Sequence, residues 1–134
     1  RGTDTPFEVI GAPWIDGRKL AAYLNERKLQ GVRFVPVKFT PSSSVFKGEV
    51  CEGVNIVVVD RSLFETLVTG VETALALRKL FPGSWEMARY NRLLVSSKTF
   101  ENIRLGKPYK TISRDWQPSL AAFNVRKKRF FLYK

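Results

Sequence analysis

The chain has 134 residues, 44% of them hydrophobic and 13% aromatic, so it can bury one ordinary core and is expected to form a single domain. Its 23 lysines and arginines against 12 aspartates and glutamates give a formal net charge of +11, which favours anionic partners such as nucleic acid, an anionic membrane or an acidic glycan. It contains no histidine and one cysteine, which excludes, within this chain, a histidine-dependent triad, an HExxH zinc site and an intrachain disulfide.

The opening residues predict a strand followed by a helix. Residues 6–10 favour an extended segment, because Phe, Val and Ile are common in strands and Pro6 suits a strand's first position. Gly11-Ala12-Pro13 then predicts a turn. Asp16 is a good N-cap for a helix over residues 17–28, whose apolar side chains fall on one face.

Two further strands are predicted, with a loop between them. Residues 32–40 alternate in hydrophobicity, and Pro36 indicates an edge strand or a bulge. Residues 41–49 hold three consecutive serines and show no periodicity, so we expect a loop there. Residues 54–59 are a nearly continuous β-branched run, typical of a central strand covered on both faces, and we expect it beside the strand of residues 32–40.

The second half of the chain is predicted to be mostly helical. The sequence Ser62-Leu63-Phe64-Glu65 matches a capping box for a helix that ends at Phe81. Residues 93–95 favour a short strand or a packed connection, and Ser97 is a suitable cap for a short helix that Gly106 closes. Apolar residues then continue at helical spacing, with Pro118 either breaking the run or opening a second helix.

Together these elements predict an α+β fold: a single small domain with a short β-sheet covered by helices and a helical C-terminal half. Cys51 is expected to be a small buried hydrophobic residue near the start of the central strand. No apolar run approaches the roughly 20 residues of a membrane span. The chain opens on Arg1, and its single methionine is Met87. We therefore expect it to be a domain cut from a longer protein.

Four ordered motifs carry a resemblance to a known family. They are Arg1-Gly2-Thr3-Asp4-Thr5-Pro6-Phe7-Glu8, Gly11-Ala12-Pro13-Trp14, Phe39-Thr40-Pro41 and Cys51-Glu52-Gly53-Val54. On these residues the chain resembles the C-terminal domain of the bacterial exo-β-N-acetylmuramidases, long catalogued as a domain of unknown function. The resemblance implies an enzyme that removes N-acetylmuramic acid from the non-reducing ends of peptidoglycan fragments. It also implies a Rossmann-like N-terminal domain as partner. Residues 1–134 would then be the C-terminal accessory domain, and the substrate cleft would lie between the two domains. We expect the protein to be periplasmic or secreted.

The opening segment is the predicted substrate-binding surface, formed by Arg1, Thr3, Asp4, Thr5, Phe7 and Glu8. The guanidinium of Arg1 can bind the lactyl carboxylate of muramic acid through two parallel hydrogen bonds. The alternative is that Arg1 forms an interdomain salt bridge. Thr3 and Thr5 offer hydroxyls to sugar or acetamido groups, although threonines before a proline are also ordinary loop residues. Phe7 and Trp14 could stack on a sugar face or belong to the core.

No catalytic residue, metal ligand or cofactor site is predicted in this chain. Glycoside hydrolysis usually needs two carboxyl groups, about 5–9.5 Å apart. In an extended segment Asp4 and Glu8 would lie about 13 Å apart, which is too far. The resemblance likewise implies that the catalytic carboxylates lie upstream, so that this domain alone is inactive.

A basic nucleic-acid-binding module is the alternative function. It depends on the cluster Arg126-Lys127-Lys128-Arg129, next to Phe130, Phe131 and Tyr133, because basic residues interleaved with aromatic ones can hold and stack single-stranded bases. Such a cluster is more often a solvent-exposed charged face without a binding role. The alternative explains none of the first fourteen residues, and the muramidase prediction therefore takes precedence.

Overall fold

The computed structural model describes residues 2–131. Its N-terminal half is built on an antiparallel sheet of three strands, β1 (Val9–Ala12), β2 (Val32–Phe39) and β3 (Cys51–Val58), in the order β1-β3-β2. The strand predicted from the β-branched run is therefore central and lies beside β2, as expected. Pairing between β2 and β3 is continuous from Val32 to Phe39, so Pro36 marks an edge strand and not a bulge.

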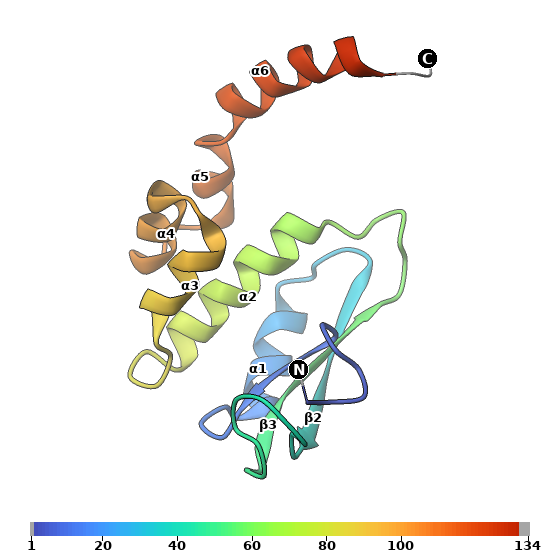
Figure 1. The fold of residues 1–134 in the computed structure, drawn as a ribbon, viewed down its shortest axis with the longest axis vertical. Coiled ribbons are helices and arrows are strands. Elements are labelled where there is room, and N and C mark those ends of the chain that lie inside the picture. The colour runs from blue at the N-terminus through green and yellow to red at the C-terminus, as the bar shows by residue number, and fades with distance from the viewer. Residues whose placement is uncertain (1, 132–134) are drawn as a thin grey trace.

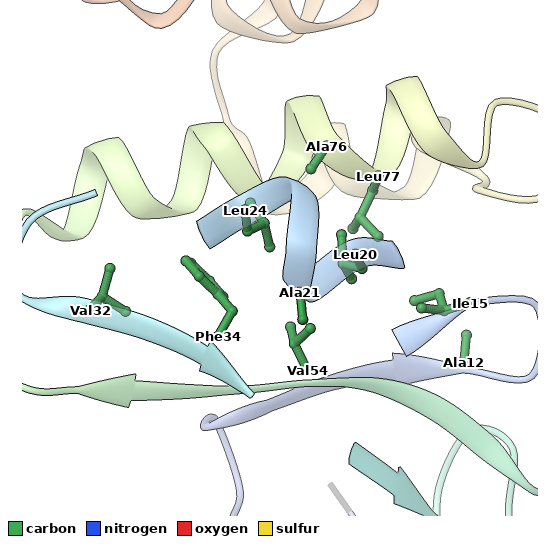
Figure 2. Close-up of a cluster of buried hydrophobic side chains, with 10 residues drawn as sticks. All are labelled: Ala12, Ile15, Leu20, Ala21, Leu24, Val32, Phe34, Val54, Ala76 and Leu77. Carbon is green, nitrogen blue, oxygen red and sulfur yellow. The ribbon is translucent and has the colours of Figure 1, made fainter. Parts of the chain in front are cut away.

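Helix α1 (Gly17–Glu26) lies between the sheet and helix α2 (Thr66–Leu80), as Figures 1 and 2 show. Leu20 and Leu24 of α1, Phe34 of β2 and Val54 of β3 are almost inaccessible to solvent and form the centre of this core. The prediction that the central strand is covered on both faces is wrong for its second half. On the face away from the helices, Val59, directly after β3, is 58% exposed, because helices cover only one face of the sheet.

Short helices complete the second half of the chain: α3 (Met87–Leu94), α4 (Ser97–Arg104) and α5 (Tyr109–Arg114). A second, smaller core of Val71, Ala74, Ile103 and Ile112 joins α2 to α4 and α5. The last helix, α6 (Gln117–Lys127), runs into a 3-10 turn (Lys128–Phe130) and extends away from the body of the domain (Figure 1). The predicted α+β domain with a helical C-terminal half is confirmed. No helix within residues 2–131 has the length and apolar character that a bilayer crossing demands.

The predicted strand over residues 6–10 is wrong in its boundaries. Residues 5–8 form a turn, in which the Glu8 amide donates to the Thr5 carbonyl at 3.3 Å and Phe7 takes a left-handed backbone with φ 73°. The strand follows and includes Gly11 and Ala12. Pro6 is compatible with both structures, because its fixed φ suits the second position of a turn as well as the first position of a strand.

The capping box predicted at Ser62 is also wrong. The Ser62 hydroxyl and amide both donate to the Asp60 carboxylate, at 2.6 and 2.8 Å, and so make a local turn. Helix α2 begins four residues later at Thr66, without a side-chain cap, and its C-cap is Phe81 as expected. Aspartate and serine side chains compete with helix geometry in this way wherever they can bond to nearby backbone amides.

Three smaller expectations about the C-terminal half are settled. The cap of α4 is Ser96 and not Ser97, because the Ser96 hydroxyl accepts from the Thr99 amide. The strand alternative for residues 93–95 is wrong: α3 reaches Leu94 and stops at Val95, whose φ is 52°. Pro118 opens α6 within its first turn, where its missing N–H costs nothing.

Candidate functional site

Two loops meet on the face of the sheet opposite the helices. The Ser42 amide donates to the Gly2 carbonyl at 2.9 Å, and the Ser42 hydroxyl reaches the same oxygen at 3.3 Å. Gly2 has φ 78°, and a Cβ there would lie only 2.9 Å from the Ser43 amide nitrogen. Only glycine fits such a contact. We call this joint between residues 2–8 and residues 41–49 the loop latch.

A small hollow lies between the two loops and the sheet, with a volume of about 270 Å³. Its floor includes Gly11, which alternates along β1 with the core residue Ala12 and so faces away from the helices. A Cβ on Gly11 would come within 2.6 Å of Cζ of the Phe39 ring, so a side chain there would collide with the wall. The residues lining the hollow are Thr3, Val9, Gly11, Phe39, Pro41, Ser44, Val45 and Phe46.

The turn of residues 5–8 stands beside this hollow and presents an aromatic ring to solvent. Phe7 is 94% exposed at the tip of the turn. The far end of the turn is fixed to the central strand, because the Ile56 amide donates to the Glu8 carbonyl at 2.7 Å. The ring of Phe7 is therefore displayed from an anchored backbone.

Backbone strain is concentrated in the two loops. Among residues 2–131, five residues other than glycine have positive φ, namely Phe7, Lys28, Ser44, Phe46 and Val95, and three of these belong to the loops of the latch. Each such residue costs on the order of 1–3 kcal/mol, and strained residues of this kind cluster at binding and catalytic sites. The strain therefore marks this region as a candidate site.

The predicted site residues that the structure describes belong to one loop. Thr3 lines the hollow, while Asp4, Thr5, Phe7 and Glu8 are exposed around it. Arg1 lies outside the described residues. Trp14, for which stacking on a sugar was an alternative, packs edge-on against Phe81 with ring centroids 5.7 Å apart and contacts the main core. This packing supports the alternative that Trp14 belongs to the core.

The turn changes the basis of the argument about Asp4 and Glu8. Their predicted separation of about 13 Å assumed an extended backbone, and that assumption is wrong because residues 5–8 turn back. The prediction that neither carboxylate is catalytic now depends only on the family resemblance. Within residues 2–131, no three His, Cys, Asp or Glu side chains gather as metal ligands would. Burial raises the pKa of the Cys51 thiol, which keeps it protonated and unreactive.

Sequence reasoning missed the contribution of loop residues 41–49 to the hollow, and it did not single out Asn55. The Asn55 side chain shares a sheet face with its partners Val9 and Val35, on the side of the hollow. Its amide oxygen is buried without a hydrogen-bond partner among the described residues. Buried polar atoms are rarely left unpaired. An asparagine inside a β-branched run was the signal that could have identified it.

The basic cluster Arg126-Lys127-Lys128-Arg129 lies at the exposed end of α6 and in the 3-10 turn, next to exposed Phe130 and Phe131. Tyr133, also part of the nucleic-acid alternative, lies outside the described residues. The cluster is far along the chain from the loop latch, and the two regions lie at different ends of the molecule in Figure 1.

Comparison with known proteins gives the family. A profile described as the C-terminal domain of the exo-β-N-acetylmuramidase NamZ matches residues 1–133. The chain belongs to this NamZ C-terminal domain family. A peptidoglycan β-N-acetylmuramidase NamZ of Bacillus subtilis strain 168 is 32% identical over 136 residues, which cover 99% of this chain. The chain spans only 33% of the length of that relative.

A solved structure shows the same fold. A crystal structure of a DUF1343 family protein from Bacteroides fragilis NCTC 9343 superimposes with a TM-score of 0.82 at 24% sequence identity, over 99% of this chain and 37% of that one. The fold of the NamZ C-terminal family is thus retained over nearly the whole chain. The family resemblance given by the four motifs is confirmed.

Proposed function

We propose that this domain forms one wall of the substrate cleft of a glycoside hydrolase that removes N-acetylmuramic acid from the non-reducing ends of peptidoglycan fragments. The observation that supports the proposal most is the match to the NamZ C-terminal family over residues 1–133. The other wall and the catalytic carboxylates would come from a Rossmann-like N-terminal domain of the same protein. A peptidoglycan substrate would be met in the periplasm or outside the cell.

The hollow at the loop latch suits a substituent of the sugar better than a whole saccharide. Its volume of about 270 Å³ lies just below the usual range of about 300–1,000 Å³ for ligand pockets. Its walls combine apolar groups from Val9 and Phe39 with the hydroxyls of Thr3 and Ser44. An acetamido group offers a methyl for such walls and an amide for such hydroxyls, so we place the N-acetyl group of the substrate here.

Phe7 and Arg1 would contact the remainder of the muramic acid. An exposed aromatic ring on an anchored turn suits the apolar face of a sugar ring. Arg1 would grip the lactyl carboxylate, the group that distinguishes muramic acid from N-acetylglucosamine, through two charge-assisted hydrogen bonds. The hydroxyl of Thr5 and the carboxylates of Asp4 and Glu8 lie on the same loop and would orient sugar hydroxyls.

The decisive experiment compares Arg1→Ala with the parent full-length enzyme on a chromogenic muramide and on the matching N-acetylglucosaminide. Each charge-assisted bond contributes about 1.5–3 kcal/mol, so kcat/KM for the muramide should fall at least about tenfold. Any activity on the glucosaminide, which has no lactyl group, should be little changed. Arg1→Lys should restore only part of the loss, because an ammonium keeps the charge but not the fork geometry. Equal damage to both substrates together with a lower Tm would instead assign Arg1 to an interdomain salt bridge.

Phe7→Ala provides an independent test of the loop. A stacked ring contributes about 0.5–1.5 kcal/mol beyond its buried area, so kcat/KM should fall by roughly 2–10-fold. Because Phe7 is 94% exposed, its removal should leave the unfolding midpoint unchanged. Leu93→Ala is the matched control, since Leu93 is 84% exposed on α3 and away from the loop. A Phe7→Ala enzyme as active as the Leu93→Ala enzyme would remove Phe7 from the site.

The isolated domain should release no N-acetylmuramic acid from the same muramide, while the full-length protein should. Turnover by residues 1–134 alone would show that catalytic residues lie on this side of the cleft. Among those residues, Asp4 and Glu8 would then be the first pair to substitute.

A further inference from the structure

The C-terminal arm, residues 117–131, is covered by nothing in the described structure. It comprises α6 and the 3-10 turn, and none of its residues is buried. Figure 1 shows it leaving the body of the domain beyond α5. Its exposed apolar side chains are Leu120, Phe123, Val125, Phe130 and Phe131, all between 44% and 79% accessible.

An apolar groove adjoins the start of the arm. The arm side contributes Leu120 and Phe123, and α2 contributes Leu67 and Val71 on the opposite side. The Trp116 ring also lines it and is held in place, because its indole N–H donates to the Thr99 hydroxyl at 2.8 Å. The groove has a volume of about 510 Å³, and we call it the arm groove.

The arm is a marginal helix as it stands. Helix α6 has 11 residues and no side-chain N-cap bond, and isolated helices shorter than about 12–15 residues are barely stable in water. Helix α2, by comparison, has seven buried residues. A short helix with contiguous exposed apolar side chains normally marks an interaction surface.

Charge argues against a second copy of this chain as the partner. The chain carries a net charge of +11. Residues 116–131 contain four consecutive cations, Arg126 to Arg129, and no acidic residue. The arm of a second copy would offer the same four cations and no carboxylate to balance them, so two arms would repel each other. A surface that combines apolar side chains with carboxylates would satisfy both parts of the arm.

We propose that the C-terminal arm and the arm groove dock onto the remainder of the same polypeptide, through an apolar surface flanked by Asp and Glu side chains. The NamZ relative of Bacillus subtilis is about three times as long as the match, since the chain covers 33% of it. A protein built in that way has ample further chain to supply the surface. The inference rests on the two-domain protein of the proposed function, and it adds a contact separate from the loop latch.

The test is hydrogen–deuterium exchange of the full-length protein, followed by mass spectrometry of peptides from the arm and from α2. Docking should protect the amides of residues 120–127 at least about 100-fold relative to an unstructured peptide, whereas an undocked marginal helix should exchange almost freely. Fast exchange of the arm in the full-length protein would overturn the proposal.

Paired variants show which surface gives the protection. Phe123→Ser and Leu120→Ser should each speed exchange of the arm at least about tenfold and leave α2 unchanged, because local opening affects only the undocked segment. Leu105→Ser is the matched control, since Leu105 is 51% exposed and Phe123 is 50% exposed, and it should not alter the arm. The double charge reversal Lys127→Glu/Lys128→Glu should have its largest effect at low salt.

Other occupants give distinguishable results. Protection that disappears on dilution, together with a dimer by light scattering, would assign the groove to a second copy. Protection that appears only on addition of single-stranded oligonucleotide would assign the arm to nucleic acid. Either result would overturn the proposal. Exchange does not depend on muramidase turnover, so a protected arm in a protein without activity on muramides would refute the proposed function and leave this inference intact.

Discussion

Gly53→Ala should destabilise the domain strongly, because β3 and β1 approach each other without room for a side chain. A Cβ at Gly53 would lie 2.6 Å from the Gly11 Cα and 2.8 Å from the Ile10 carbonyl carbon, and closer still to the Ile10 carbonyl oxygen. All of these are backbone atoms, so no side-chain rotation can relieve the clash. Overpacking of this kind typically costs about 1–3 kcal/mol. Displacing β1 also breaks ladder hydrogen bonds that contribute about 1 kcal/mol each.

The expected loss is therefore at least about 3 kcal/mol in the free energy of unfolding, measured by urea denaturation with tryptophan fluorescence. Gly70→Ala is the matched control. No atom lies within 4 Å of its added Cβ, and alanine is favoured over glycine inside a helix by roughly 0.5–1 kcal/mol, so this variant should be more stable than the parent. If the free energy of unfolding of Gly53→Ala is within about 1 kcal/mol of that of the parent, β1 can move at little cost, and the argument that β1 and β3 leave no room for a side chain fails.

Three further outcomes follow from the contacts of the helices. Arg27 and Glu72 form a salt bridge at 3.0 Å, and the Glu72 side chain is only 7% exposed. Arg27→Met should lower the free energy of unfolding in urea by about 3 kcal/mol and Glu72→Gln by roughly 1–2 kcal/mol, because only the first leaves a buried carboxylate without its partner. Equal losses would contradict this. Asp16→Ala should remove the hydrogen bond that caps α1 and lower the free energy of unfolding by about 1 kcal/mol in the same assay. An unchanged midpoint would show that this hydrogen bond does not stabilise the helix. Hydrogen bonding to Lys98 lowers the pKa of Asp115, so the stability that this contact contributes is present above about pH 4 and is lost as pH falls through the lowered value. The stability advantage of the parent over Asp115→Asn should shrink on acidification below pH 4, and an advantage independent of pH would refute the assignment.

The parts of the fold that could be predicted from sequence are those that local patterns determine. The spacing of Leu20, Tyr23 and Leu24 and the cap at Asp16 place α1 correctly, because they involve residues within two helical turns. The β-branched run at residues 54–59 identifies the central strand for a similar reason. The starts of β1 and α2 were misplaced because Pro6 and Ser62 each fit two local structures, and tertiary contacts choose between them.

The candidate site could be predicted only in part. The motif at residues 1–8 identified one loop through its family resemblance. The latch itself joins Gly2 to Ser42, 40 residues apart in sequence, and no periodicity or spacing relates such positions. The strained backbone of Ser44 and Phe46 was equally hidden, since neither residue type is typical of positive φ.

The hydrogen bonds that hold the site loop in place are mostly bonds between main-chain atoms. Gly2 with Ser42, Thr5 with Glu8, and Glu8 with Ile56 are joined in this way, so apart from the glycine these positions need no particular side chain for the bond itself. The side chains around the hollow can accordingly be exchanged while the frame keeps its shape. If the proposed function is correct, variants at Thr3, Asp4 and Thr5 should change which glycan is accepted while the backbone that displays these residues keeps its structure.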